Sequence, residues 1–567
     1  MIRVIKEGYR DWKKLCFNLP FCGGLLLMMC VSYATLLHNP TIGIDDTSFD
    51  VYYEEGVSPA MGRWVLFLLN KFVPLNYNPY MVEAVGLLVF CISVSIWCLV
   101  FYKVFGERIP RGGYLAFGCA MLSNSILAEV VVWYLQDGLY VGYGLAALSV
   151  FFGIQAFEKK DRTKRSTGWI SLGLSAVFLT AAAGCYESLL LVWGISMLAV
   201  FMVFRILRKE DYSVRPGEWL GKLAICGVAA IVLRTAIVSL FIHVFDLEVQ
   251  TQVLKSRGLH EVLAWFDGTK RLEDFFYVLK AFFVKYYING IVYLPILLLV
   301  LAEIIIGIFA LCYMIKRRDG FILLAAVGMI LAPWIMPVLE GVATYYRSSQ
   351  YIPVVTAFAI LLLAWKIQEI SNAKRLKPAL CSTIRGIAAV LLLILLYHQA
   401  YDMNRWFYID HLKYEDTKNT LEEVALVIKR DHDASKPICV IGKYETPESL
   451  LVEAYCPSWS KKYLLTEFLV KKVDESLFEE YNTPYGYTFV ETPHLSFISW
   501  GATAFYQFDR ELIKFWNIHG FNFREDSDLE HYKAAKEIMK GGPAWPKEGS
   551  VVEMEDYIIV NFGDGQF

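Results

Sequence analysis

Charged residues are scarce in this sequence of 567 residues, at 19% of the chain, whereas a soluble globular protein carries about 25%. Hydrophobic residues make up 56% and aromatic residues 15%, and the mean hydropathy is +0.42. Such a composition excludes a soluble enzyme, a disordered protein and a fibre. It predicts a protein that crosses a membrane several times.

Cysteine motifs are also lacking. The twelve cysteines form no Cys-x-x-Cys pattern and no cysteine–histidine ligand pattern, and most lie in apolar runs, where cysteine behaves as a small hydrophobic residue. Cys439 and Cys456 lie near the C-terminus and are able to pair in an oxidising compartment, but their spacing leaves this open. We expect no metal site, no cofactor and no nucleic-acid partner.

The net charge of −2 hides an uneven distribution. Residues 1–401 contain 36 Lys and Arg against 27 Asp and Glu, whereas residues 402–567 contain 18 against 29. The division predicts a basic membrane domain, 1–401, and an acidic domain, 402–567.

Eleven apolar runs are long enough to cross a bilayer as helices. They lie at about 17–38, 80–104, 113–134, 138–157, 169–185, 187–206, 221–245, 290–314, 320–338, 351–370 and 385–401. Lys and Arg concentrate at the N-terminus and in every second loop, as in Lys316-Arg317-Arg318. The positive-inside rule therefore predicts a cytoplasmic N-terminus and, with an odd number of spans, an extracytoplasmic C-terminal domain in the plasma (inner) membrane. The first run lacks a small-residue cleavage site and is expected to be a signal anchor.

Two predicted outer segments, 39–79 and 246–289, are too long to be simple turns. Within the second, Leu259–Phe266 and Phe275–Tyr287 have the pattern of amphipathic helices at a membrane surface. Long loops over a helical bundle usually shape a site. The sequence shows no repeat of fixed period, which counts against an inverted-repeat transporter. The predicted fold is a polytopic α-helical membrane protein.

The acidic domain has the pattern of a small α/β fold. Asp416–Arg430 is predicted to form a helix, with Leu421, Val424, Val427 and Ile428 on one face. Ile438–Ile441 and Tyr557–Val560 are predicted to form short buried strands. The domain contains no catalytic triad and no phosphate loop, so we expect it to be a structural cap or an acceptor-docking domain.

The strongest local motif is Gly43-Ile44-Asp45-Asp46, directly after the first span. Adjacent carboxylates at a membrane surface are costly unless they are solvated, paired or bound to a cation. One of them is suited to act as a general base on a hydroxyl, and the other to orient an acceptor or hold a cation. The alternative is a solvated acid pair or a helix N-cap.

Further ionisable residues lie near span ends that are predicted to face outward and indicate an outward-open polar pocket. They are Glu83, Glu129, Asp137, Glu187, Glu340 and Arg347. Glu187, in a tight turn, is either structural or pocket-lining. Arg347, among aromatic and hydroxyl side chains, suits a phosphate group or anchors the loop at the interface. Lys255, Arg257, Lys270 and Arg271 suit a phosphate or lipid headgroups equally well. Arg234 and Glu303, deeper in their spans, are candidates to pair with each other.

The acid pair followed by Gly62-Arg63-Trp64 ahead of the second span resembles the serotype-converting O-antigen glucosyltransferases of the Gtr type-two family, which belong to the GT-C superfamily. The Tyr186-Glu187 turn, where relatives often have Tyr-Gln, is similar to that family too. The same holds for the Tyr346-Arg347 loop and for the C-terminal segment from Trp545 to Val560. The resemblance extends over nearly the whole chain.

The resemblance implies an inverting glycosyltransferase with a polyprenyl-phosphate-linked sugar donor, whose sugar, glucose in this family, faces outward. The acceptor is then a cell-envelope polysaccharide or lipid-linked glycan. By position, Asp45 is the base and Asp46 its helper, and Arg63 or Arg347 holds the lipid phosphate. Trp64, Glu187 and Tyr346 belong to the implied substrate-binding region. The competing hypotheses are a transporter or flippase of a lipid-linked glycan and a non-catalytic scaffold.

Overall fold

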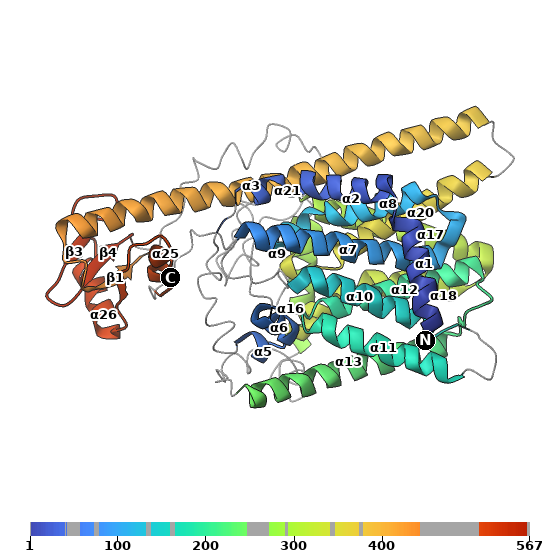
Figure 1. Ribbon diagram of the computed structural model, residues 1–567, viewed down its shortest axis with the longest axis horizontal. Coiled ribbons are helices and arrows are strands. Elements are labelled where there is room, and N and C mark those ends of the chain that lie inside the picture. Colours follow the sequence, from blue (N-terminus) through green and yellow to red (C-terminus); the bar gives the residue numbers. More distant parts are fainter. Residues whose placement is uncertain are drawn as a thin grey trace. The chain divides into compact units, whose positions relative to one another are not determined.

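The computed structural model describes residues 2–39, 41, 57–72, 79–131, 138–158, 165–245, 272–289, 293–340, 346–372, 378–442 and 510–563. Two compact units account for them (Figure 1). The first contains the described residues up to Leu37 and those from Val57 to Asn404, and we call it the helical unit. The second contains residues 38, 39 and 41 and those from Arg405 onward, and we call it the C-terminal unit.

The helical unit is built almost entirely from helices. They are α1 (Ile2–Cys16), α2 (Leu19–Ser32), α3 (Ala34–His38, whose last residue belongs to the other unit), α5 (Val57–Ala60), α6 (Trp64–Phe72), α7 (Pro79–Phe105), α8 (Arg111–Leu122), α9 (Ala128–Val131), α10 (Gly138–Gln155), α11 (Arg165–Ala183), α12 (Leu189–Leu207), α13 (Pro216–Val244), α16 (Leu272–Phe283), α17 (Leu294–Arg317), α18 (Gly320–Leu331), α19 (Ile335–Glu340), α20 (Ile352–Asn372) and the first part of α21 (Pro378–Asp431).

Eight helical segments in the described part of the chain are long and apolar enough to cross a membrane: α7, α10, α12, α13, α17, the α18–α19 segment, α20 and α21. A ninth candidate is the bent pair α1–α2, whose axes meet at 75°. Asn18 caps α2 at this bend by accepting a hydrogen bond from the Phe21 N–H at 3.1 Å. Helices also occupy the remaining predicted runs, with α11 apolar but shorter and α8 only 12 residues long. The protein is therefore a polytopic membrane protein, and the count of eleven spans stays a prediction.

Helix α10 lies at the centre of the helical unit and packs against α7, α11 and α12 (Figure 1). Ser149 and Ser175 join α10 to α11, because each hydroxyl donates to the other residue's carbonyl oxygen, at 2.7 and 2.8 Å. Interhelical hydrogen bonds and small residues are typical of helix contacts in membranes. By contrast, α13 leaves most of its apolar side chains exposed, among them Leu220, Val228 and Val232, as expected of a surface that contacts lipid.

The basic loops meet at one end of the helical unit. Lys14 forms an ion pair with Glu107 at 2.7 Å, Glu158 pairs with Tyr212 as a β-bridge, and Arg205 pairs with Asp319 at 2.5 Å. The described parts of these basic loops therefore lie together at one end of the unit. Which end faces the cytoplasm stays a prediction.

Helix α21 differs from the expected arrangement. The sequence suggests a span at 385–401 and a separate helix at Asp416–Arg430, but both belong to one helix of 54 residues. No proline follows Pro378 within the helix and no glycine follows Gly386, so no residue in the polar stretch between the two parts favours ending it.

The C-terminal unit contains a four-stranded sheet of order β2-β1-β4-β3. Its elements are β1 (Pro437–Ile441), α25 (Arg510–Ile518), β2 (Arg524–Glu525), α26 (Leu529–Ile538), β3 (Val551–Glu553) and β4 (Ile558–Asn561). Strand β1 pairs in parallel with β2 and β4, and β3 is antiparallel to β4. Both predicted strands are therefore confirmed.

Side chains alternate across this sheet as a strand requires. Ile438 and Val440 pack with α25 and with the end of α21, whereas Cys439 and Ile441 pack with α26. On α21, Leu421, Val424 and Ile428 are buried in the first of these clusters, as predicted, but Val427 is only partly buried. Cys439 is buried, and Cys456 lies outside the described residues, so their pairing stays open.

Candidate functional site

A tight turn before α6 positions Arg63. The Arg63 N–H donates to the Ser58 carbonyl oxygen at 2.9 Å, and the Gly62 N–H donates to that of Pro59 at 2.8 Å. Gly62 has φ +86°, in the left-handed region that favours glycine. A Cβ at this position would lie 1.8 Å from the Arg234 Nη2. Glycine is thus required both by the backbone conformation and by the approach of a second arginine.

The turn between α11 and α12 packs against the start of α6 and brings Tyr186 and Glu187 to Arg63. The Val65 N–H donates to the Gly184 carbonyl oxygen at 3.0 Å, which fixes the start of α6 on this turn. Trp64 packs so closely on Gly184 that a Cβ there would lie 2.5 Å from the indole Nε1. The Arg63 guanidinium lies over the Tyr186 ring, 4.6 Å from its centre, in cation–π geometry.

Glu187 joins two arginines. Its Oε1 accepts a hydrogen bond from Arg234 Nη2 at 2.6 Å, and its Oε2 lies 3.9 Å from Arg63 Nε. The same Arg234 nitrogen donates to the Met61 carbonyl oxygen at 3.0 Å. We call Arg63, Trp64, Tyr186, Glu187 and Arg234 the arginine–glutamate cluster.

The arginine–glutamate cluster has an excess of positive charge, since two guanidinium groups share one carboxylate. The Arg63 side chain is only 11% exposed. The Nε atoms of Arg63 and Arg234 and the Trp64 Nε1 have no hydrogen-bond partner among the described residues. Guanidinium groups bind phosphate oxygens in bidentate geometry, so this arrangement is suited to an anionic group such as a phosphate.

Tyr346 and Arg347 belong to a different network. Tyr346 is buried, and its ring packs against those of Tyr286 and Tyr293, with centres 5.0 and 5.8 Å away. The Arg347 carbonyl oxygen accepts a hydrogen bond from the Gln350 side chain at 2.5 Å. These contacts hold the loop before α20 and leave the Arg347 side chain partly exposed.

Several predicted site residues lie outside the described residues. They are Asp45, Asp46, Asp137, Lys255, Arg257, Lys270 and Arg271, and the side chains of Glu129 and Glu340 are likewise undescribed. Glu83 is buried, with 1% of its surface exposed. The structure therefore brings together Arg63, Trp64 and Glu187 from the predicted set, and the catalytic roles of Asp45 and Asp46 stay predictions.

The suggested pairing of Arg234 with Glu303 is wrong. Arg234 pairs with Glu187, because α13 packs against α11 and the turn that carries Glu187 follows α11. Glu303 accepts a hydrogen bond from the Tyr287 hydroxyl at 3.0 Å instead. Arg234 and Tyr186 are the members of the cluster that were not predicted as site residues, although Arg234 carried one signal. It is a lone cation in an apolar run, and such a residue requires a partner or a polar cavity.

Residues 34–364 match the family model described as Glucosyl transferase GtrII. This range covers more than half of the chain. The chain belongs to the GtrII glucosyltransferase family. The resemblance inferred from the sequence is thereby confirmed over these residues, and no curated protein matches the chain.

Membership of the GtrII family makes this protein a membrane glycosyltransferase, with a sugar donor and a glycan acceptor as substrates. The matched range includes the arginine–glutamate cluster and Arg347 and ends within α20. The C-terminal unit from Arg405 onward lies beyond it.

Proposed function

We propose that this GtrII protein transfers glucose from a polyprenyl-phosphate-linked donor to a cell-envelope glycan at the outer face of the plasma (inner) membrane. The observation that carries the proposal is the arginine–glutamate cluster, which places two arginines around one carboxylate at the ends of α11 and α12. A donor whose sugar and lipid are joined through a phosphate needs such a cationic site, and its lipid chain needs an apolar surface beside it.

The apolar surface is available on the helix that supplies Arg234. Along α13, Leu233 and Leu240 are exposed, at 41% and 56%. A polyprenyl chain that lies along such a surface stays in the hydrocarbon region of the membrane, while its phosphate reaches the arginines near the predicted outer end. A soluble nucleotide-sugar donor would use the arginines but gain nothing from the apolar surface.

The proposed reaction is a single inverting displacement. The acceptor hydroxyl attacks the anomeric carbon, Asp45 takes the hydroxyl proton, and the bond from that carbon to the phosphate oxygen breaks with its electron pair on the oxygen. Asp46 orients the acceptor. Arg63 or Arg347 stabilises the negative charge that grows on the departing lipid phosphate.

The remaining residues have supporting roles in this proposal. Trp64 and Tyr346 shape the donor site, and Glu187 holds Arg63 and Arg234 in place. The domain 402–567 lies outside the membrane and serves as a cap or an acceptor-docking domain. The domain 1–401, with outer segments 39–79 and 246–289, is the GT-C-like catalytic part.

The test is glucose transfer by the full chain in lipid nanodiscs, with labelled polyprenyl-phosphate-glucose and the acceptor glycan. We expect Asp45→Asn to lower transfer by about a hundredfold or more, because the loss of a general base typically costs 10²–10⁴-fold. Asp50→Asn, in the same predicted outer segment, is the matched control and is expected to keep transfer.

Two results would contradict the proposal. Unchanged transfer in both Asp45→Asn and Asp46→Asn would rule out the mechanism. Movement of the labelled lipid across a liposome membrane without cleavage of its sugar–phosphate bond would favour the flippase alternative.

A further inference from the structure

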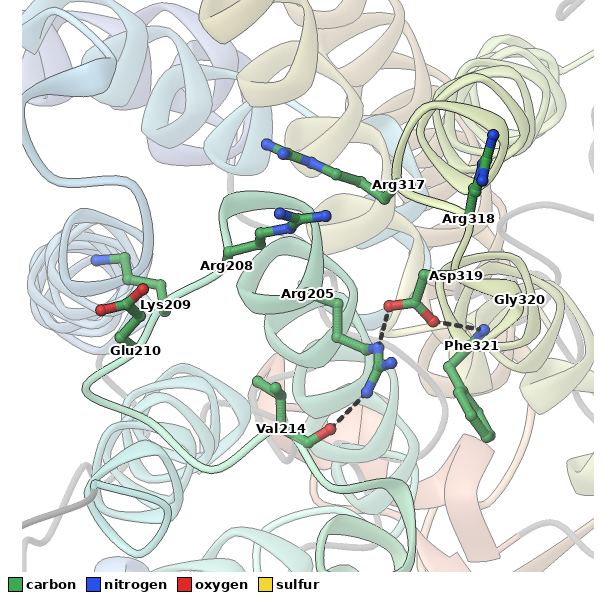
Figure 2. A pocket seen from close by; sticks show the side chains of 10 residues that line it. All are labelled: Arg205, Arg208, Lys209, Glu210, Val214, Arg317, Arg318, Asp319, Gly320 and Phe321. Atoms are coloured by element: carbon green, nitrogen blue, oxygen red, sulfur yellow. Dashed lines mark hydrogen bonds and ion pairs between the residues drawn. The ribbon is translucent and has the colours of Figure 1, made fainter.

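A second cationic site lies at the end of the helical unit where the basic loops meet. A cavity of about 550 Å³ is bounded on one side by the end of α12 and the loop that follows it, and on the other by the turn between α17 and α18 (Figure 2). Five of its lining residues are cations and two are acids. Its charged lining includes Arg205, Arg208, Lys209, Arg317, Arg318 and Asp319.

Two of these arginines stand where glycine is common. Arg208 ends α12 with φ 49° and Arg318 ends α17 with φ 53°, and a left-handed residue after a helix is usually glycine. Cations near a helix C-terminus do offset the helix dipole. That effect, like the positive-inside rule, favours cations in these loops but does not require them at the left-handed position itself.

One ion pair builds the wall of the cavity. Arg205 Nε donates to Asp319 Oδ2 at 2.5 Å, and Arg205 Nη1 donates to the Val214 carbonyl oxygen at 2.6 Å. The other Asp319 oxygen accepts from the Phe321 N–H at 3.1 Å and so caps α18. Arg205 and Asp319 therefore neutralise each other and stabilise the local structure.

Apart from the pair of Arg205 and Asp319, the cavity lining has more cations than acids. Arg208, Lys209, Arg317 and Arg318 line the cavity with Glu210 as its other carboxylate, and Figure 2 draws no interaction from these four side chains to the other lining residues. Arg317 Nε is buried without a hydrogen-bond partner among the described residues. Burial and the neighbouring charge of Arg108 lower the pKa of Lys209, as expected where cations crowd together.

Apolar surface borders the cavity. Phe321 lines it and is 43% exposed, and Leu324, three residues further along α18, is 59% exposed. Residues three apart lie on the same face of a helix. An anion with an apolar tail would therefore place its charged end in the cavity and its tail along α18, which a free phosphate ion would not use.

We propose that this cavity binds the phosphate headgroup of an anionic phospholipid, with its acyl chains along Phe321 and Leu324. Basic pockets between transmembrane helices at the cytoplasmic surface are known to hold such headgroups. The site is distinct from the arginine–glutamate cluster in residues and in role, and it does not depend on the proposed glucosyl donor.

The test is native mass spectrometry of the full chain in neutral detergent, titrated with phosphatidylglycerol or with phosphatidylcholine of the same acyl chains. We expect the wild type to bind phosphatidylglycerol several-fold more tightly. The triple variant Arg208→Gln, Arg317→Gln, Arg318→Gln is expected to lose at least about tenfold in that affinity, because each cation near a headgroup contributes to binding. Binding of phosphatidylcholine should stay unchanged.

Lys316→Gln is the matched control, since Lys316 is adjacent in sequence but lies 3.9 Å from Glu369 and does not line the cavity. It is expected to keep the preference. If the triple variant does not fold, Arg318→Gln alone replaces it, because Arg318 is exposed, and a smaller loss is expected.

Three outcomes would overturn the proposal. They are equal affinity of the wild type for the two lipids, a preference that survives in a folded arginine variant, and displacement of phosphatidylglycerol by inorganic phosphate. The last outcome would assign the cavity to a soluble anion.

Discussion

Glu187 is the residue on which the arginine–glutamate cluster depends. It is the carboxylate that Arg63 and Arg234 share, and it binds Arg234 at 2.6 Å. Removal of one partner of a partly buried ion pair leaves the other charge uncompensated, which is costly. A neutral side chain of the same length keeps a hydrogen-bond acceptor in place.

We therefore expect Glu187→Gln and Glu187→Ala to differ. Glu187→Ala should lower the free energy of unfolding by about 2 kcal/mol, seen as a lower melting temperature in detergent. Glu187→Gln should retain most of the stability and lower the KM for the lipid donor, because it increases the positive charge at the phosphate. Equal melting temperatures for the two variants would show that the hydrogen bond from Arg234 to residue 187 does not hold the turn.

Gly62 has no side chain and therefore leaves room for the Arg234 guanidinium. Gly62→Ala introduces a Cβ 1.8 Å from Arg234 Nη2 and places alanine at φ +86°. We expect a loss of donor affinity together with a loss of stability of about 2–3 kcal/mol.

Gly106→Ala separates the two effects. Gly106 also has a positive φ, +61°, but a Cβ there would meet no atom within 4 Å. This control should lose only about 1 kcal/mol and keep its donor affinity. If the two variants behaved alike, the contact with Arg234 would have no role.

At the scale of elements, the helical unit is held together by close approaches around α10. A Cβ on Gly144 would lie 2.7 Å from the Ser93 Oγ of α7, and that hydroxyl donates to the Tyr140 carbonyl oxygen at 2.6 Å. The helices can approach this closely only because the position is glycine.

Gly144→Ala should therefore destabilise the protein by about 1–3 kcal/mol, as overpacking usually does. Gly194→Ala, in α12, would add a Cβ with no atom within 4 Å and should leave the melting temperature unchanged or slightly higher. The measurement is the melting temperature of both variants in the same detergent. A stable Gly144→Ala protein would contradict the packing described for α7 and α10.

Elements with strong local patterns were predictable from the sequence. The apolar runs form helices, and Ile438–Ile441 and Tyr557–Val560 form strands that pair with each other. The continuity of α21 was not predicted, because a change from apolar to polar side chains suggests a boundary although no residue in between ends a helix. The burial of Ala425 in place of Val427 reflects the direction from which β1 and α25 pack.

Interactions between distant segments were the least predictable. Arg63, Glu187 and Arg234 lie far apart in the sequence. No local sequence pattern predicts that one carboxylate contacts both arginines. Tyr346 was predicted from its neighbour Arg347, but its ring packs in an aromatic group with Tyr286 and Tyr293. Such pairings follow from helix packing, which a single sequence does not specify.

At the scale of the whole molecule, the account predicts a fixed orientation in the membrane. The N-terminus and the basic loops should face the cytoplasm, and the domain 402–567 should lie outside. An epitope tag after Phe567 should be cut by a protease added to intact spheroplasts, whereas a tag before Met1 should be protected until the membrane is permeabilised. The opposite pattern would place the arginine–glutamate cluster on the wrong side for the proposed reaction.

The central claim is that the arginine–glutamate cluster binds the lipid phosphate of the donor. Its most direct test is the affinity of the full chain for polyprenyl phosphate, with the uncharged polyprenol as reference, in wild type and Arg63→Gln. Arg63→Gln leaves the bond between Glu187 and Arg234 in place, and Arg385→Gln is the control because Arg385 is exposed and bonded to Ser371 and Gln368. We predict that Arg63→Gln loses about tenfold or more in affinity for polyprenyl phosphate, while its affinity for polyprenol stays unchanged. The Arg385→Gln protein should keep the wild-type affinity for polyprenyl phosphate. Equal affinity of wild type and Arg63→Gln for polyprenyl phosphate would contradict the account.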